Sequence, residues 1–223
     1  MIFEKNPFYA YTQIEQVRKS LLKDGTIVEL TDFGTGNKRE SSVANIATKS
    51  LESAKFGQLL FRLVNFFQPQ NILELGTSLG VSTMYLAKPS STAKVVTMEG
   101  SRSLCDIAER NFKNADVDNV EVVCGNINES LGDVVAKFSK LDFVYFDANH
   151  TREATLRYFE LCLQKAHKDA IFVFDDIHYS AEMESAWNEI KKRSDVCLSI
   201  DLYHFGLVFF NTDLPKQHYI VAF

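Results

Sequence analysis

Three carboxylates follow two apolar runs in the second half of the chain. Asp147 ends the run LDFVYFD, and Asp175 and Asp176 end IFVFDD. Such runs predict buried strands, and neighbouring parallel strands bring their carboxyl ends to one edge of a sheet. Carboxylates gathered there repel one another unless a cation lies between them, and oxygen ligands suit Mg²⁺ or Ca²⁺ better than zinc. The alternative is that these acids cap the helices that follow.

A glycine-rich turn occurs earlier, in Asn71 to Ser82 (NILELGTSLGVS). An apolar run leads to Gly76, Gly80 follows four residues later, and helix-forming residues come next. The pattern predicts a buried strand over Ile72–Leu75, a tight turn and a helix over Ser78–Ala87. Such a turn lets a small molecule lie against bare backbone. Because position 78 is Ser, the middle glycine of the dinucleotide motif G-x-G-x-x-G is missing.

Two acids flank this turn. Glu74 lies near the end of the apolar strand, where a carboxylate costs free energy unless a fixed partner such as loop backbone or a ligand amine satisfies it. Glu99 ends the next predicted strand, about where a carboxylate binds a ribose diol. The alternative for Glu99 is a solvated acid at a strand end.

The elements that must position these residues alternate along the chain. Apolar spacing predicts a helix over 56–67, and five strands alternate with helices from residue 72 to residue 190. The closing strands have no helices between them, which predicts an antiparallel hairpin. The expected fold is α/β, a Rossmann-like doubly wound sheet, mostly parallel in order 3-2-1-4-5, with helices on both faces and an antiparallel C-terminal hairpin strand. The expected strands are Ile72–Leu75, Ala93–Met98, Val120–Val123, Leu141–Phe146, Ala170–Phe174, Val196–Leu202, Gly206–Phe210 and Tyr219–Phe223.

Composition narrows the class of protein. With 223 residues, 46% of them hydrophobic, the chain can form a sizeable core. A net charge of −5 argues against recruitment of nucleic acid or an anionic membrane. No apolar run is long enough to span a membrane, and the N-terminus lacks the layout of a signal peptide. Four scattered cysteines predict neither a disulfide framework nor a zinc site. We therefore expect a cytoplasmic protein.

The sequence E-L-G-T-S-L-G, followed by M-E after the next strand, resembles the class I S-adenosylmethionine (SAM)-dependent methyltransferases. The resemblance implies that the turn Glu74–Ser78 binds the methionine part of SAM and that Glu99 binds the ribose hydroxyls. It also implies adenine contacts from the segment after the third strand. The cofactor-binding residues so implied are Glu74, Gly76, Thr77, Ser78, Gly80, Ser82, Glu99, Gly100, Gly125, Asn126, Ile127, Asn128 and Asp147.

Within this class, the carboxylates resemble those of the metal-dependent catechol and caffeoyl-CoA O-methyltransferases. That family has an aspartate after strand four, matched by Asp147, and an Asp-Asn pair after strand five, where this chain has Asp175 and Asp176. The resemblance implies Asp147, Asp175 and Asp176 as ligands of Mg²⁺ or Ca²⁺, and Asp147 as catalytic. His150 stands where the catechol enzymes have a catalytic Lys, and a neutral imidazole can take a hydroxyl proton near neutral pH.

The sequence thus predicts a SAM-dependent methyltransferase that methylates an oxygen of a small-molecule acceptor by in-line attack on the methyl carbon. Two alternatives stay open: a non-catalytic SAM-binding module and an NAD-dependent oxidoreductase. Residues 51–223 are expected to form the methyltransferase domain. Residues 1–50 are expected to form an N-terminal helical extension. Aromatic residues and glycines in that extension predict a lid over the acceptor pocket, formed by Phe8, Tyr9, Tyr11, Phe33, Gly34 and Gly36. Whether the protein forms a homodimer is left open.

The remaining histidines are weaker candidates. His178 follows the Asp pair closely and could face the same site or serve the loop. His167, His204 and His218 are expected to be structural or solvated.

Overall fold

A computed structural model describes residues 4, 7–31, 38–213 and 215–223. The chain divides into two compact units. The first comprises Met1–Gln70 and Gly76–Ile127, and the second comprises Asn71–Leu75 and Asn128–Phe223. Three residues of the predicted lid, Phe33, Gly34 and Gly36, lie outside the described residues.

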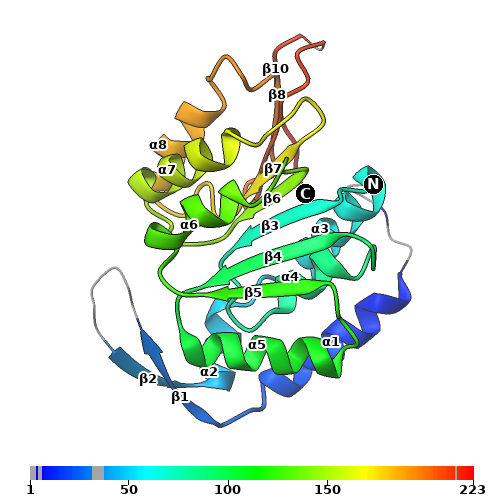
Figure 1. The fold of residues 1–223 in the computed structure, drawn as a ribbon, viewed down its shortest axis with the longest axis vertical. Coiled ribbons are helices and arrows are strands. Elements are labelled where there is room, and N and C mark those ends of the chain that lie inside the picture. The colour runs from blue at the N-terminus through cyan, green and yellow to red at the C-terminus, as the bar shows by residue number, and fades with distance from the viewer. Residues whose placement is uncertain (1–3, 5–6, 32–37, 214) are drawn as a thin grey trace. The chain divides into compact units, whose positions relative to one another are not determined.

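Eight strands form a mixed sheet in the order β10-β8-β9-β7-β6-β3-β4-β5 (Figure 1). Counted from β3, this order contains the predicted 3-2-1-4-5 arrangement. β9 runs antiparallel to both β7 and β8, whereas β10 runs parallel to β8. The predicted α/β fold, with a mostly parallel sheet and an antiparallel C-terminal strand, is therefore confirmed.

The first unit holds the helices α1 to α5 and the strands β1, β2, β4 and β5. A separate hairpin pairs β1 with β2 in antiparallel register. β4 and β5 are parallel, with Glu99 opposite Cys124. The bounds are α1 Tyr9–Leu21, β1 Ile27–Thr31, β2 Lys38–Ser42, α2 Val43–Ser50, α3 Ala54–Phe67, α4 Val81–Ala87, β4 Lys94–Glu99, α5 Arg102–Asn114 and β5 Val120–Cys124; α6 Ile127–Ala136 begins at the end of this unit.

The second unit holds the remaining strands, with β3 and β6 in parallel register so that Glu74 lies opposite Tyr145. β6 and β7 are also parallel, and Phe146 lies opposite Phe174. The bounds are β3 Asn71–Leu75, β6 Phe143–Phe146, α7 Arg152–Leu163, β7 Ile171–Phe174, α8 Ala181–Ile190, β8 Leu198–Asp201, β9 Gly206–Phe209 and β10 Gln217–Ile220.

Aromatic packing holds α1 in the first unit. The Tyr11 ring is buried, and its centroid lies 5.1 Å from that of Phe61 on α3 and 5.9 Å from that of Tyr85 on α4. Gly57 on α3 leaves room for the Tyr85 ring, because an added Cβ there would lie 2.5 Å from it. Tyr11 therefore belongs to the core, whereas its neighbour Tyr9 is 76% exposed.

The structure adds elements that the sequence did not predict and shifts the bounds of others. The hairpin β1–β2 and the helix α2 were not predicted, since KRESS in β2 has no alternating apolar face. The helix after the glycine turn begins at Val81 rather than near Ser78, because Gly80 is its N-cap in the left-handed region. The last strand is Gln217–Ile220 instead of Tyr219–Phe223, and all four of its residues are exposed.

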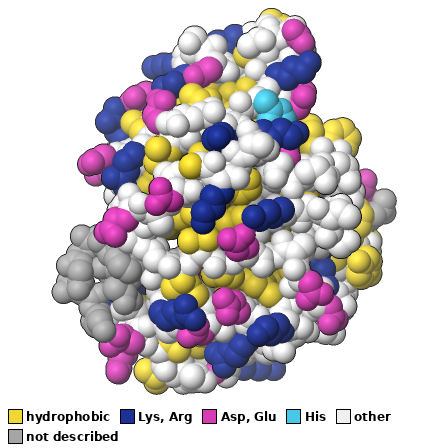
Figure 2. Space-filling model, in the orientation of Figure 1, with side chains coloured by type: hydrophobic (Ala, Val, Ile, Leu, Met, Phe, Trp, Pro, Cys, Tyr) yellow, Lys and Arg dark blue, Asp and Glu magenta, His cyan; other side chains and the backbone are white. Residues whose placement is uncertain are grey.

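The surface shows no separation of charge on the face seen in Figure 2, where acidic and basic side chains alternate. Within the described part of the chain, no helix is long and apolar enough to cross a membrane.

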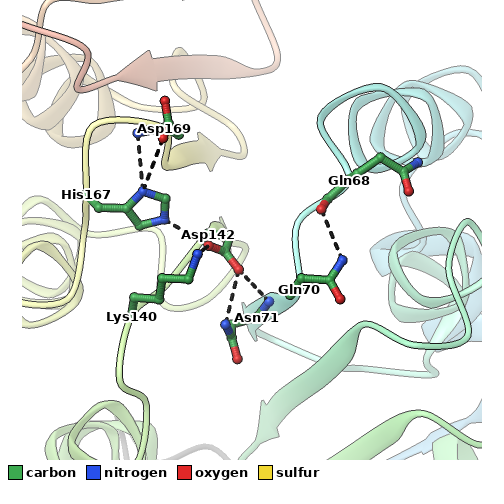
Figure 3. Close-up of polar contacts among 7 residues, drawn as sticks. All are labelled: Gln68, Gln70, Asn71, Lys140, Asp142, His167 and Asp169. Carbon is green, nitrogen blue, oxygen red and sulfur yellow. Dashed lines mark hydrogen bonds and ion pairs between the residues drawn. The ribbon is translucent and has the colours of Figure 1, made fainter.

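A buried carboxylate ties the starts of β3 and β6 together in the second unit (Figure 3). Asp142 is 8% exposed, and its Oδ2 accepts hydrogen bonds from the backbone N–H of Asn71 (2.8 Å) and from Asn71 Nδ2 (3.1 Å). Its Oδ1 lies 2.9 Å from Lys140 Nζ and 2.8 Å from His167 Nε2. His167 is thus structural, as predicted.

Replacing Asp142 with Ala should lower the free energy of unfolding by about 2 to 4 kcal/mol, because the part-buried N–H groups of Asn71 and the ring of His167 lose their shared partner. Urea denaturation measures the loss. Asp169→Ala is the matched control, since that side chain is 68% exposed in the same loop as His167. The control should stay within about 0.5 kcal/mol of wild type. Equal losses in the two variants would contradict the prediction.

Candidate functional site

The glycine turn is fixed to β4 by its first two residues. Gly76 has φ +103°, in the region that favours glycine, and its N–H donates to Met98 O at 2.9 Å. The N–H of Thr77 donates to the same carbonyl at 3.2 Å, and its hydroxyl lies 2.5 Å from that of Thr97. Thr97 was not singled out from the sequence, because a Thr inside a strand has no distinguishing pattern.

The middle of the turn is held by Glu99. Its Oε2 accepts a hydrogen bond from the N–H of Ser78, and its Oε1 accepts one from the N–H of Ser101, both at 2.9 Å. Ser78 itself has φ +49°, in the left-handed region. Burial raises the pKa of Glu99 above its ordinary value, while these backbone donors act in the opposite sense. The predicted Glu99 therefore lies directly at the turn.

The turn ends at Gly80, with φ +83°, where α4 begins. A Cβ at Gly80 would lie 2.6 Å from the Phe112 ring of α5 and 3.2 Å from Cβ of Ala108. Only glycine fits this approach. Ser82, another predicted cofactor residue, is 9% exposed within α4.

The segment after β5 begins beside Glu99. The N–H of Gly125 donates to Glu99 O at 2.8 Å. Gly125 has φ +148°, and nothing lies within 4 Å of where its Cβ would be. The segment Gly125–Ile127 of the first unit therefore begins beside Glu99. Gly100 is also next to Glu99, because it follows Glu99 in the chain.

Asn128, in the second unit, has a different environment. Its Oδ1 accepts hydrogen bonds from the hydroxyl of Tyr158 at 2.5 Å and from Arg157 on α7. The side-chain carbonyl is thus already used within the protein.

Glu74 is fully buried in β3. Its position opposite Tyr145 places it inside the sheet. Of the two partners predicted for its carboxylate, zero exposure favours a partner within the protein over a ligand amine.

Asp147 and Asp175 follow neighbouring strands of the second unit. The N–H of Asp147 donates to Leu75 O at 2.8 Å, and that of Asp175 donates to Phe146 O at 2.9 Å. Asp175 is 6% exposed, whereas the Asp147 side chain is 20% exposed. Asp176 has φ +53° and its Oδ1 lies 3.9 Å from Nδ1 of His204. Across the described ranges, no group of three or more His, Cys, Asp or Glu side chains is arranged to hold a metal ion.

His150 lies beside Asp147. Its Nε2 is 3.4 Å from Asp147 Oδ1, and its side chain is 30% exposed. Asn149 and His150 have φ values of +65° and +32°, conformations that are uncommon outside glycine and that concentrate at functional sites. The exposed ring of Tyr179 lies 6.2 Å from the His150 ring. A partly exposed imidazole next to a carboxylate can accept a proton.

The other candidate histidine, His178, has a structural partner. Its Nε2 lies 3.0 Å from Asp201 Oδ2, which also accepts a hydrogen bond from Trp187 Nε1 at 3.0 Å. His178 therefore serves the loop, which was one of the two roles considered for it.

Known proteins resemble this chain in sequence over part of its length. Residues 73–177 match a family model described as a methyltransferase domain. Catechol O-methyltransferase of Mycobacterium tuberculosis is 32% identical over 127 residues, which are 56% of this chain and 56% of that protein. The chain's match spans little more than half the length of this curated relative.

Solved structures share the fold. An O-methyltransferase from Bacillus cereus in complex with SAH has a TM-score of 0.67 at 23% identity, covering 93% of each chain. The O-methyltransferase TomG from Streptomyces achromogenes, in complex with SAM, has a TM-score of 0.66 at 21% identity, covering 93% of this chain and 92% of that one. The resemblance predicted from the glycine turn and its acids is therefore confirmed.

The raised pKa of Glu99 predicts a pH-dependent stability. The native state holds this proton more tightly than the unfolded chain, whose carboxyl has a pKa near 4.5. Relative to Glu99→Gln, the wild-type free energy of unfolding should therefore be highest below pH 4.5 and should fall as the pH rises through the raised pKa of Glu99. Urea denaturation of both proteins across this range measures the difference. A difference that grows with pH would contradict the prediction.

Proposed function

We propose that this chain, whose family is that of the class I SAM-dependent methyltransferases, transfers the methyl group of SAM to an oxygen of a small-molecule acceptor. The observation that carries the proposal is the carboxylate of Glu99, oriented at the glycine turn by the N–H groups of Ser78 and Ser101. A fixed carboxylate accepts hydrogen bonds well from the two hydroxyls of a ribose.

The same contact argues against a dinucleotide. A pyrophosphate needs backbone N–H donors at the turn, but the N–H of Ser78 is already used by Glu99. An ionised Glu99 would also repel phosphate. SAM has no phosphate, and its ammonium group and sulfonium suit an acidic environment.

Different residues would bind the three parts of SAM in this proposal. The turn from Gly76 to Gly80 would hold the methionine part of SAM against bare backbone. Thr77 would fix the backbone course of this turn. Glu99 and Gly100 would bind the ribose. The segment from Gly125 to Asn128 would border the adenine, although the side-chain carbonyl of Asn128 already serves α7. Glu74 is buried in β3, two residues before the turn in the chain, and is assigned no direct contact with SAM.

His150 and Asp147 are proposed for the acceptor. Bound SAM would supply an electrophilic methyl group and leave as SAH. His150 would take the proton of the acceptor hydroxyl as the oxygen forms its bond to carbon and the carbon–sulfur bond breaks. Asp147, 3.4 Å from Nε2, would orient the imidazole and stabilise its protonated form.

Mg²⁺ or Ca²⁺ at Asp147, Asp175 and Asp176 stays a prediction. Asp147 and Asp175 follow neighbouring strands, whereas Asp176 faces His204. Among the described residues, these three carboxylates do not form a set of metal ligands. No step is therefore assigned to an ion. Methyl transfer measured with and without EDTA decides whether one takes part.

Isothermal titration with SAM tests the cofactor assignment. Wild type should bind SAM, and Glu99→Ala should weaken binding by about ten- to a hundredfold, because hydrogen bonds to a charged group are lost. Glu121→Ala is a matched control, since that acid is exposed on β5 and pairs with Lys94. Binding of NAD in place of SAM would support the oxidoreductase alternative. SAM binding without transfer to any of a panel of acceptors would support the non-catalytic module.

Replacing His150 with Ala should lower kcat by about a hundredfold or more while leaving the affinity for SAM unchanged, because a positioned general base contributes on that scale. Steady-state kinetics at saturating SAM measures kcat. His218→Ala is the control, since that imidazole bonds Ser199 at 2.8 Å on the strand pair β8–β10. Normal turnover in His150→Ala would remove His150 from the mechanism.

A further inference from the structure

The face of α5 that meets the glycine turn carries a buried amide. Asn111 is 8% exposed, and its Nδ2 donates a hydrogen bond to the backbone carbonyl of Leu79 at 2.9 Å. Leu79 is itself fully buried. The two residues are 32 positions apart in the sequence, so this contact exists only in the fold.

The carbonyl of Leu79 has no donor from the ladder of α4. That ladder begins with the bond from Met84 N to Gly80 O at 3.1 Å, one residue after Leu79. A buried carbonyl without a donor costs free energy, so a side chain must supply one. Asn111 supplies it.

Successive residues of α5 thus fix successive residues of the turn. Asn111 bonds Leu79, and the ring of Phe112 closes on Gly80, where a Cβ would lie 2.6 Å away. The other anchors of the turn come from β4 and from Glu99, which act on Gly76, Thr77 and Ser78. Asn111 is accordingly the polar anchor at the end of the turn nearest α4.

We propose that Asn111 is a positioning residue for the cofactor turn, and that its bond to Leu79 sets the affinity for SAM. This inference rests on the proposed function. Asn111 does not touch the cofactor in this proposal; it acts through the backbone at Leu79–Gly80. Without this hydrogen bond, packing against Phe112 would remain but the carbonyl of Leu79 would lose its donor. The turn would then have to become ordered when SAM binds, which costs binding free energy.

The surroundings of Asn111 favour a folded variant. The side chain also lines an open cavity of about 310 Å³ between α1 and α5, together with Gln13, Gln16 and Asn114. Shortening Asn111 would enlarge this open cavity instead of creating a sealed void, so the cost to stability should be moderate.

Asn119 provides a matched control at the other end of α4. Its Nδ2 donates to the carbonyls of Ala87 at 3.3 Å, Ser90 at 2.9 Å and Ala93 at 2.9 Å. It is the same residue type with the same kind of bond, but it does not contact the turn. Its loss should lower stability and leave SAM affinity unchanged.

The experiment compares wild type, Asn111→Ala, Asn111→Asp and Asn119→Ala in the full chain. Isothermal titration gives the Kd for SAM, thermal unfolding gives Tm, and steady-state kinetics gives KM for SAM and kcat. Asn111→Ala should raise Kd and KM about five- to tenfold, the scale of one neutral hydrogen bond. Its kcat at saturating SAM should stay within about twofold of wild type. Asn111→Asp keeps the size and removes the donor, so its affinity should fall at least as far.

The outcomes separate this inference from the proposed function. If wild type does not bind SAM, both are overturned. If wild type binds SAM and the Asn111 variants bind it equally well, the role of Asn111 is overturned and the proposed function stands. Weaker SAM binding in Asn119→Ala at an equal loss of Tm would show that general stability, not the turn, controls affinity, and would likewise overturn the role. If either Asn111 variant fails to fold, the other, measured against Asn119→Ala, decides.

Discussion

Two hydrogen bonds to one carboxylate hold the glycine turn and the loops beside it in place. Glu99 is the last residue of β4, and its carboxylate accepts hydrogen bonds from the N–H of Ser78 in the turn and the N–H of Ser101 before α5. Its own carbonyl accepts from Gly125 after β5. One residue thus joins three loops that are far apart in the sequence. Burying the carboxylate has a cost, which its raised pKa records, and the backbone donors offset part of it.

Periodicity was enough to predict the sheet and most of its helices, because buried strands and amphipathic helices repeat with distinct periods. It failed where elements are short and polar. The hairpin β1–β2 was missed because its second strand, KRESS, has no apolar residue, and the bounds of β10 were shifted because all four of its residues are exposed. The start of α4 was displaced because a left-handed Gly80, instead of a side-chain cap, begins it.

The sequence singled out some residues that the structure places at the glycine turn and did not single out others. Gly76, Gly80 and Glu99 could be found because their residue types are unusual at the end of a strand. Asn111 could not, since an Asn in an amphipathic helix looks like any polar position and its partner is a backbone carbonyl. For Asp176, the strand-end pattern gave the position but not the direction of the side chain. Its Oδ1 lies 3.9 Å from Nδ1 of His204, and no periodicity encodes that pairing.

The close approach of Gly80 to Phe112 has an evolutionary consequence. The ring occupies the space that any side chain at position 80 would need, so neither residue can change size independently. A larger residue at 80 would require a small one at 112 together with a backbone that tolerates φ +83°. Among related sequences the two positions should therefore covary, and a pairing of a bulky residue 80 with Phe112 should be absent from proteins that keep this turn.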